Sequence, residues 1–128
     1  METRRIGFLV YEDLQALDLV GPFDAFGAAN ECAGKGETPY ELVTVGFNVS
    51  PARAENGLAF VPDVALEDVP ELDTLVIPGG RGSRMLNRDL RVLDWIGQRA
   101  RDTRRLVSTC TGIYLLAATG LLDGRKAT

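Results

Sequence analysis

The chain has 128 residues, of which 45% are hydrophobic and 25% are charged. These values predict one globular domain, residues 1–128, with a substantial core, and they exclude a disordered chain. The formal net charge of −4 makes this segment by itself a poor binder of nucleic acid or of an anionic membrane. Histidine is absent, which excludes Ser-His and Cys-His catalysis and histidine metal sites within these residues.

The chain shows no targeting or membrane-spanning pattern. No apolar run approaches the roughly 20 residues that a membrane span needs, and the apolar residues 6–11 are too few for the core of a signal peptide. We therefore expect a cytoplasmic protein without membrane contact. Its two cysteines, Cys32 and Cys110, are then expected to be free thiols. No metal site and no cofactor is expected.

Strand and helix patterns alternate along the first half of the chain. Residues 5–11 form a short apolar run that is typical of a buried parallel strand. An amphipathic helix follows from Leu19, with Pro22 in its first turn. Residues 41–46 predict a second strand, and Asn56-Gly57 followed by apolar residues indicates a hairpin.

The second half continues this alternation. Residues 74–77 predict a third core strand that runs into Pro78-Gly79-Gly80. Asp89 is expected to cap a helix that extends to Ala100, with its apolar stripe at Leu93, Ile96, Gly97 and Ala100. The alternation predicts an α/β fold with a mainly parallel sheet and helices on its faces.

The last third of the chain predicts a fourth core strand over residues 106–109 and a buried helix over residues 112–119, ending at Gly120. Residues 121–128 indicate a turn into another strand, which the sequence cuts off. We therefore expect the domain to be incomplete at its C-terminus.

Arginines are concentrated in residues 81–105, which hold eight of them. Such a run is most often the solvated face of a helix. The alternative is a patch that faces an anion or a protein partner.

Cys110 lies where a strand is expected to end and a helix to begin, in Ser108-Thr109-Cys110-Thr111-Gly112. This strand–turn–helix arrangement follows the same logic as the nucleophile elbow, which exposes a side chain at the carboxyl end of a sheet. Unpaired N–H groups at the start of a helix also stabilise a thiolate. The alternative is a small buried hydrophobic residue at the end of a strand.

Two other features could complete a site around Cys110. The amides of Gly79 and Gly80, together with that of Thr111, could bind an oxyanion or a carboxylate; otherwise the loop is an ordinary tight turn. Asp18 could be a helix cap, or a buried carboxyl that meets Cys110 and supplies a hydrogen bond or a proton.

Four segments together resemble one known family: RRIGFLVY, LDLVGPFDAFGAAN, LDTLVIPGG and VSTCTGIYLLAATGLLDGRKAT. The chain resembles the ThiJ/PfpI, or class I glutamine amidotransferase-like, superfamily, and most of all the N-terminal domain of AraC-family transcriptional regulators. The resemblance implies a flavodoxin-like fold. It also implies that Cys110 is the elbow cysteine, that Asp18 faces it, and that Gly79, Gly80 and Thr111 line the pocket.

The resemblance also limits the function. Peptidase-like and chaperone-like members carry histidine after the cysteine and glutamate as the acid, whereas this chain has Thr111 and Asp18. That pattern is similar to isonitrile hydratases and to the regulators. The resemblance implies a small-molecule-sensing domain of a regulator that binds DNA through a further domain. Residues 23–30 favour this function, because they resemble regulators more than hydratases.

Two alternatives remain. One is a hydratase, in which the Cys110 thiolate adds to an isocyanide and Asp18 supplies the proton on the way to an N-formyl amine. The other is a redox-sensing thiol. The superfamily further implies a homodimer, for which residues 81–105 are one candidate interface.

Overall fold

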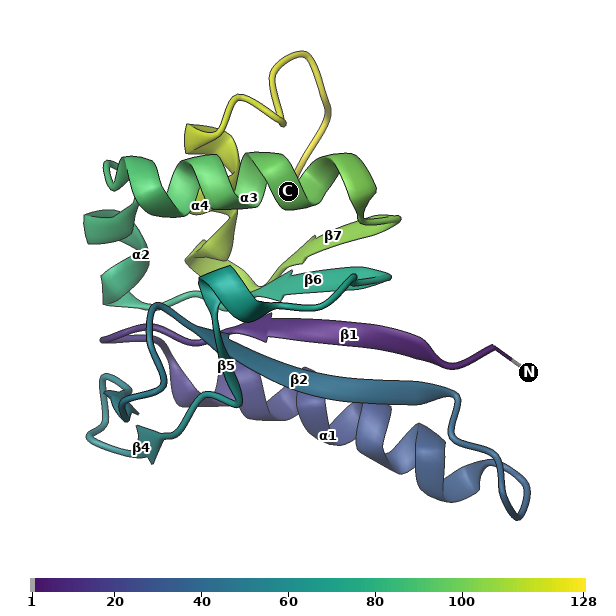
Figure 1. The fold of residues 1–128 in the computed structure, drawn as a ribbon. Helices are drawn as coiled ribbons and strands as arrows, with labels where there is room; N and C mark the ends of the chain where they lie inside the picture. The colour runs from purple at the N-terminus through teal and green to yellow at the C-terminus, as the bar shows by residue number, and fades with distance from the viewer. Residues whose placement is uncertain (1) are drawn as a thin grey trace.

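The computed structural model describes residues 2–128 and contains a five-stranded sheet in which all pairings are parallel (Figure 1). The strand order is β5-β2-β1-β6-β7, so the chain winds outward in both directions from β1. The strands are β1 (Arg4–Leu9), β2 (Tyr40–Gly46), β5 (Val64–Ala65), β6 (Thr74–Ile77) and β7 (Arg105–Ser108). This is the α/β fold that the sequence pattern predicted, and its flavodoxin-like type is the one that the resemblance implied.

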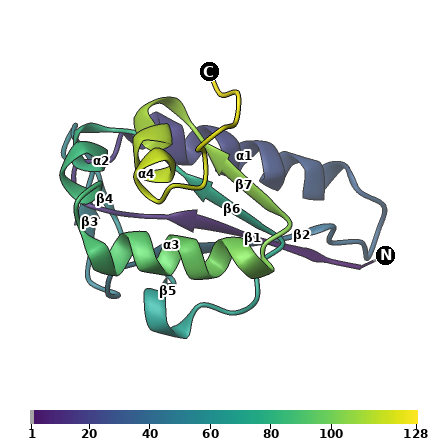
Figure 2. The same cartoon turned by 90° about the horizontal axis from the view of Figure 1, so that it is seen from above.

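Helices cover both faces of the sheet (Figures 1 and 2). Helix α1 lies on one face, and α3 and α4 lie on the other. The helices are α1 (Ala16–Cys32), α2 (Arg81–Leu86), α3 (Leu90–Asp102) and α4 (Ile113–Ala118), with 3₁₀ turns η1 (Leu66–Asp68) and η2 (Cys110–Gly112). Within residues 2–128, no helix is long and apolar enough to cross a membrane.

The core is built on the two central strands. All four residues of β6 are buried, and β1 is buried from Ile6 onward, because helices pack on both faces of these strands. Phe8 of β1 is fully buried and stacks against Phe23 and Phe26 of α1, at ring-centroid distances of 5.0 and 6.2 Å. These aromatic contacts hold α1 on the sheet.

The predicted start of α1 was wrong by one turn. The helix begins at Ala16, so Pro22 lies in its interior rather than in its first turn. Asp18 is consequently the third residue of the helix and not its cap; the cap residue is Gln15, whose N–H donates to the carbonyl of Gly79 at 2.8 Å. Tertiary contacts with the neighbouring loop therefore set where this helix starts.

The predicted hairpin and the Asp89 cap are both confirmed. Strands β3 (Ala52–Arg53) and β4 (Ala59–Phe60) pair antiparallel around Gly57, whose φ of +90° favours glycine. Asp89 accepts hydrogen bonds from two N–H groups in the first turn of α3. The buried stripe of α3 is shifted from the predicted one, since Val92, Trp95 and Ile96 face the sheet.

The last elements are less buried than predicted. Strand β7 is at the edge of the sheet and is paired only with β6, which leaves Val107 37% exposed. Helix α4 is six residues long, and its Tyr114 is half exposed while Leu115 and Leu116 are buried. The expected turn forms near residues 119–124, and residues 125–128 have no regular structure.

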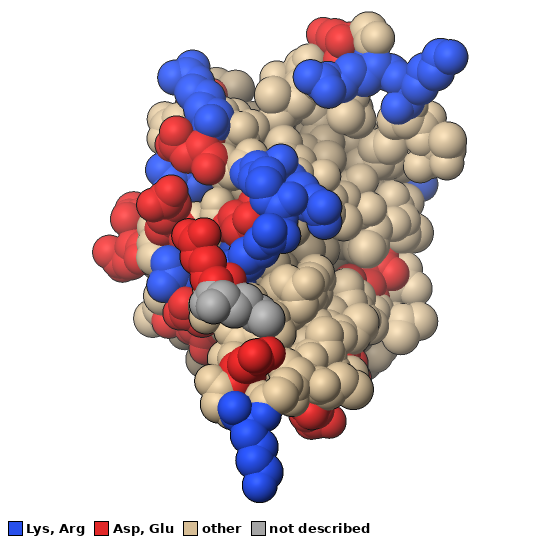
Figure 3. Space-filling model, turned by 90° about the vertical axis from the view of Figure 1, so that its right-hand side faces the viewer, with Lys and Arg blue, Asp and Glu red and all other residues tan. Residues whose placement is uncertain are grey.

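The arginine-rich residues 81–105 are partly neutralised by ion pairs. Arg91 pairs with Glu67, and Arg104 donates two hydrogen bonds to Asp73. Figure 3 shows the amino ends of the strands, where basic and acidic side chains lie side by side. Arg4, Asp73 and Arg104 are among the residues that line a cavity of about 470 Å³ there. The pairs are consistent with the solvated-face interpretation at Arg91 and Arg104.

Candidate functional site

The predicted site residues meet at the carboxyl edge of the sheet. Because β1, β6 and β7 are adjacent and parallel, the segments that follow them emerge side by side. These segments are residues 11–15 after β1, the Pro78–Gly80 loop after β6, and Cys110 after β7. Helix α1 adds Asp18 from below the sheet.

Cys110 has the backbone geometry of an elbow. Its φ is +51°, a region that non-glycine residues rarely adopt, and its side chain is exposed. The preceding Thr109 is held by a hydrogen bond from its N–H to the carbonyl of Ile77 at 3.0 Å. Cys110 is the first residue of the 3₁₀ turn η2, which leads directly into α4, so the predicted strand–turn–helix is confirmed with one extra turn.

Asp18 connects α1 to both neighbouring loops. Its Oδ2 accepts a hydrogen bond from the N–H of Gly79 at 3.2 Å. Its carbonyl oxygen accepts one from the hydroxyl of Thr109 at 3.3 Å. The residue four positions later is Pro22, which has no N–H to donate, so this carbonyl lacks its usual partner in the helix. The proline thus leaves an acceptor for the residue next to Cys110.

The Pro78–Gly80 loop has its polar backbone groups satisfied within the chain. Its two amides donate to side chains: Gly79 to Asp18, and Gly80 to the Thr111 hydroxyl at 2.9 Å. The loop's carbonyls accept from Tyr11, from Gln15 at 2.8 Å and from Ser83 at 2.7 Å. Neither loop amide is therefore free to bind an oxyanion in this structure. The expected roles of these amides and of Thr111 remain predictions.

Three glycines at the site have no room for a side chain: Gly79 and Gly112, where the loop packs against the residues after Cys110, and Gly80, where the loop packs against residues 13–15. A Cβ on Gly79 would lie 2.7 Å from the N of Thr111 and 2.9 Å from Oδ2 of Asp18. A Cβ on Gly112 would lie 2.2 Å from the carbonyl oxygen of Ile77, and Gly80 combines close backbone contacts with a φ of +134°. Glycine is thus required for this approach.

Tyr11 is a site residue that the sequence interpretation missed. It follows β1, is 1% exposed, and donates its hydroxyl to the carbonyl of Pro78. Burial raises the pKa of Tyr11 far above its usual value, and the nearby carboxylates of Asp18 and Glu55 raise that pKa further. A tyrosine at the end of the apolar run of residues 6–11 was the available signal, since a buried hydroxyl needs a partner.

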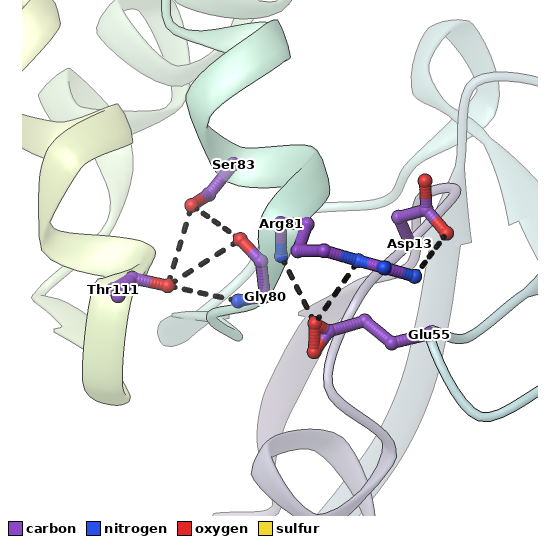
Figure 4. Close-up of polar contacts among 6 residues, drawn as sticks. All are labelled: Asp13, Glu55, Gly80, Arg81, Ser83 and Thr111. Atoms are coloured by element: carbon purple, nitrogen blue, oxygen red, sulfur yellow. Dashed lines mark hydrogen bonds and ion pairs between the residues drawn. The ribbon is translucent and has the colours of Figure 1, made fainter.

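Two acidic side chains, Asp13 and Glu55, lie beside Arg81 next to the Pro78–Gly80 loop (Figure 4). Arg81, at the start of α2, pairs with Asp13 at 3.5 Å and with Glu55 at 3.7 Å. Glu55 comes from the β3–β4 hairpin and its N–H donates to the carbonyl of Leu14 at 2.9 Å. The hairpin is thereby attached beside the site.

The grouping contains a thiol, a carboxylate and a hydroxyl, which can bind polar ligands or perform nucleophilic chemistry. Within residues 2–128, no three Cys, Asp or Glu side chains are grouped so that they could hold a metal ion. Cys32 is exposed at the last residue of α1, at the other end of that helix from Asp18, and is not part of the site.

Comparison with known proteins gives consistent relatives. The profile of the DJ-1/PfpI family matches residues 4–128. An isonitrile hydratase of Pseudomonas putida is 36% identical over 124 residues, which are 97% of this chain and 51% of that protein. The HTH-type transcriptional regulator GbdR of Pseudomonas aeruginosa is 31% identical over 120 residues, which are 93% of this chain and 32% of that protein.

A solved structure supports the same relationship. The crystal structure of a THiJ/PfpI family protein from Pseudomonas syringae aligns with a TM-score of 0.86 and 30% identity, covering 97% of this chain and 49% of that one. The chain spans about half the length of the hydratase and about a third of that of the regulator.

Proposed function

Because the chain belongs to the DJ-1/PfpI family, we propose that it is the small-molecule-sensing domain of a cytoplasmic transcriptional regulator of the AraC type. In this proposal Cys110, Asp18 and Thr111 contact the ligand, and DNA is bound by a further domain. The similarity to GbdR over 93% of this chain supports it, because that relative is a regulator about three times as long.

One observation carries the preference for binding over turnover. Both amides of the Pro78–Gly80 loop are already donated, one to Asp18 and one to Thr111. Acyl-type and addition chemistry needs donors that are preorganised for the developing negative charge. A loop whose N–H donors are occupied offers less stabilisation to a developing negative charge. Reversible binding of a ligand next to the exposed Cys110 does not require such donors.

The second candidate is an isonitrile hydratase-like enzyme, favoured by 36% identity to that relative. Here the Cys110 thiolate adds to the isocyanide carbon, Asp18 delivers a proton, and water addition followed by thiol release gives the N-formyl amine. The Gly79, Gly80 and Thr111 amides would stabilise the developing negative charge, which requires the first two to leave their present partners.

The experiment separates the two candidates with the natural full-length protein. Its intact mass is measured first, because a regulator must exceed this chain by a further domain of roughly 100 residues. The protein is then incubated with tert-butyl isocyanide, and the N-formyl amine is quantified for the parent, Cys110→Ala and Asp18→Asn. Equal product from all three supports the sensor; product that disappears in Cys110→Ala and falls in Asp18→Asn overturns it in favour of the enzyme.

Two further expectations belong to this proposal. A homodimer is expected, and gel filtration with light scattering tests it. Redox sensing remains the third candidate: both cysteines are exposed, so it requires dilute peroxide to oxidise Cys110 well before Cys32. Equal, slow oxidation of both would contradict it.

A further inference from the structure

Tyr11 connects the central strand to the loop beside the cysteine. The residue is 1% exposed, and its hydroxyl donates to the carbonyl of Pro78, 67 residues later in the chain. Both groups are buried, so this bond satisfies polar atoms that water does not reach. Removing the hydroxyl would leave the carbonyl of Pro78 without this donor.

The carbonyl of Pro78 lies where three segments meet. On one side is the Tyr11 hydroxyl. On the other is the backbone of η2, since a Cβ on Gly112 would lie 2.9 Å from this oxygen. The same peptide group carries the N–H of Gly79, which donates to Oδ2 of Asp18 at 3.2 Å. A displacement of Pro78 would therefore change both the Asp18 contact and the packing of the Cys110 elbow.

We propose that Tyr11 is a positioning residue of the site, whose hydroxyl holds Pro78 so that Gly79 faces Asp18 and the Cys110 elbow packs against the loop. Tyr11 itself contacts no ligand in this role. The role is independent of the proposed function, because a sensor and an enzyme need the same arrangement.

The surroundings of the phenol suit a permanent donor. Burial, together with the nearby carboxylates of Asp18 and Glu55, raises the pKa of Tyr11 further above the physiological pH range, in which the hydroxyl is protonated. It thus keeps donating to Pro78 when neighbouring groups change their charge.

The test uses Tyr11→Phe, which removes only the hydroxyl. The matched control is Trp95→Phe, which also removes a buried hydrogen bond from a side chain to a carbonyl. In the parent, Nε1 of Trp95 donates to the carbonyl of Leu66 at 2.9 Å, outside the site. Two readouts are taken on each protein. One is the rate of alkylation of Cys110 by iodoacetamide, with Cys32 as an internal reference in the same sample. The other is the resonance position and hydrogen-exchange protection of the Gly79 and Gly80 amides.

The expected result is local. In Tyr11→Phe, the ratio of Cys110 to Cys32 alkylation changes, and protection of the Gly79 amide falls, each by at least about five-fold, the factor that corresponds to one lost buried hydrogen bond. In Trp95→Phe neither the ratio nor the glycine resonances change, although the protein is destabilised. The proposal is overturned if Tyr11→Phe leaves the ratio and the resonances as in the parent, or if Trp95→Phe alters them equally.

If Tyr11→Phe does not fold, the parent protein still provides a test. The proposal requires that the Gly79 and Gly80 amides of the parent be protected like core amides, because the loop is held in place. Exchange at the rate of an unfolded peptide at both glycines would overturn it.

Discussion

Substituting Gly79 by alanine tests the close packing between the loop and the elbow. The backbone φ of Gly79 is not in the positive region, so alanine is conformationally allowed there and only space decides the outcome. The new Cβ would lie 2.7 Å from the N of Thr111, 2.8 Å from its Oγ1 and 2.9 Å from Oδ2 of Asp18. The elbow or the carboxylate must therefore move.

The magnitude follows from two terms. Overpacking at a tightly packed position costs about 1–3 kcal/mol, and weakening the bond from Gly79 to Asp18 adds about 1 kcal/mol. We expect Gly79→Ala to lower the free energy of unfolding by roughly 2–4 kcal/mol and to change the rate at which iodoacetamide alkylates Cys110.

The matched control is Gly97→Ala on α3. A Cβ at Gly97 would meet no atom within 4 Å, so this change should stabilise the helix by roughly 0.5–1 kcal/mol. Urea unfolding of the parent and both variants gives the free energies, and mass spectrometry gives the alkylation rates. If Gly79→Ala unfolds at the parental urea concentration with an unchanged Cys110, the described packing is wrong.

Two further predictions concern other parts of the fold. Pro22→Ala restores an N–H that competes with the Thr109 hydroxyl for the carbonyl of Asp18. The helix gains about 3 kcal/mol from the removal of proline and loses about 1 kcal/mol with the displaced hydrogen bond. The melting temperature of the variant should therefore rise, and a lower melting temperature would contradict this expectation. Hydrogen bonding from Arg104 holds the pKa of Asp73 below its usual 3.8. The unfolded chain therefore binds more protons below about pH 4 and stability falls there. In Asp73→Asn, the urea midpoint of unfolding should depend less steeply on pH between pH 2 and 5 than in the parent. The same pH dependence in both proteins would contradict this prediction.

The sequence by itself determined the α/β fold and most of its elements. Short apolar runs such as residues 74–77 have a period and length that fit a strand buried on both faces, and β6 has these bounds. Local chemistry was sufficient at Asp89 and at Asn56-Gly57, because a cap and a tight turn depend on neighbours within a few residues. The change from strand to helix around Cys110 was predicted in the same way, from an abrupt change of pattern.

Tertiary structure decided what joins these elements. The start of α1 depends on a bond from Gln15 to Gly79, 64 residues away in the chain, and periodicity carries no record of it. The occupied amides of Gly79 and Gly80, and the bond from Tyr11 to Pro78, likewise involve residues that only the sheet order brings together. The residue types at the site could be read from the sequence. The pairing of hydrogen-bond donors with acceptors could not, because it depends on parallel strands that end at the same edge of the sheet.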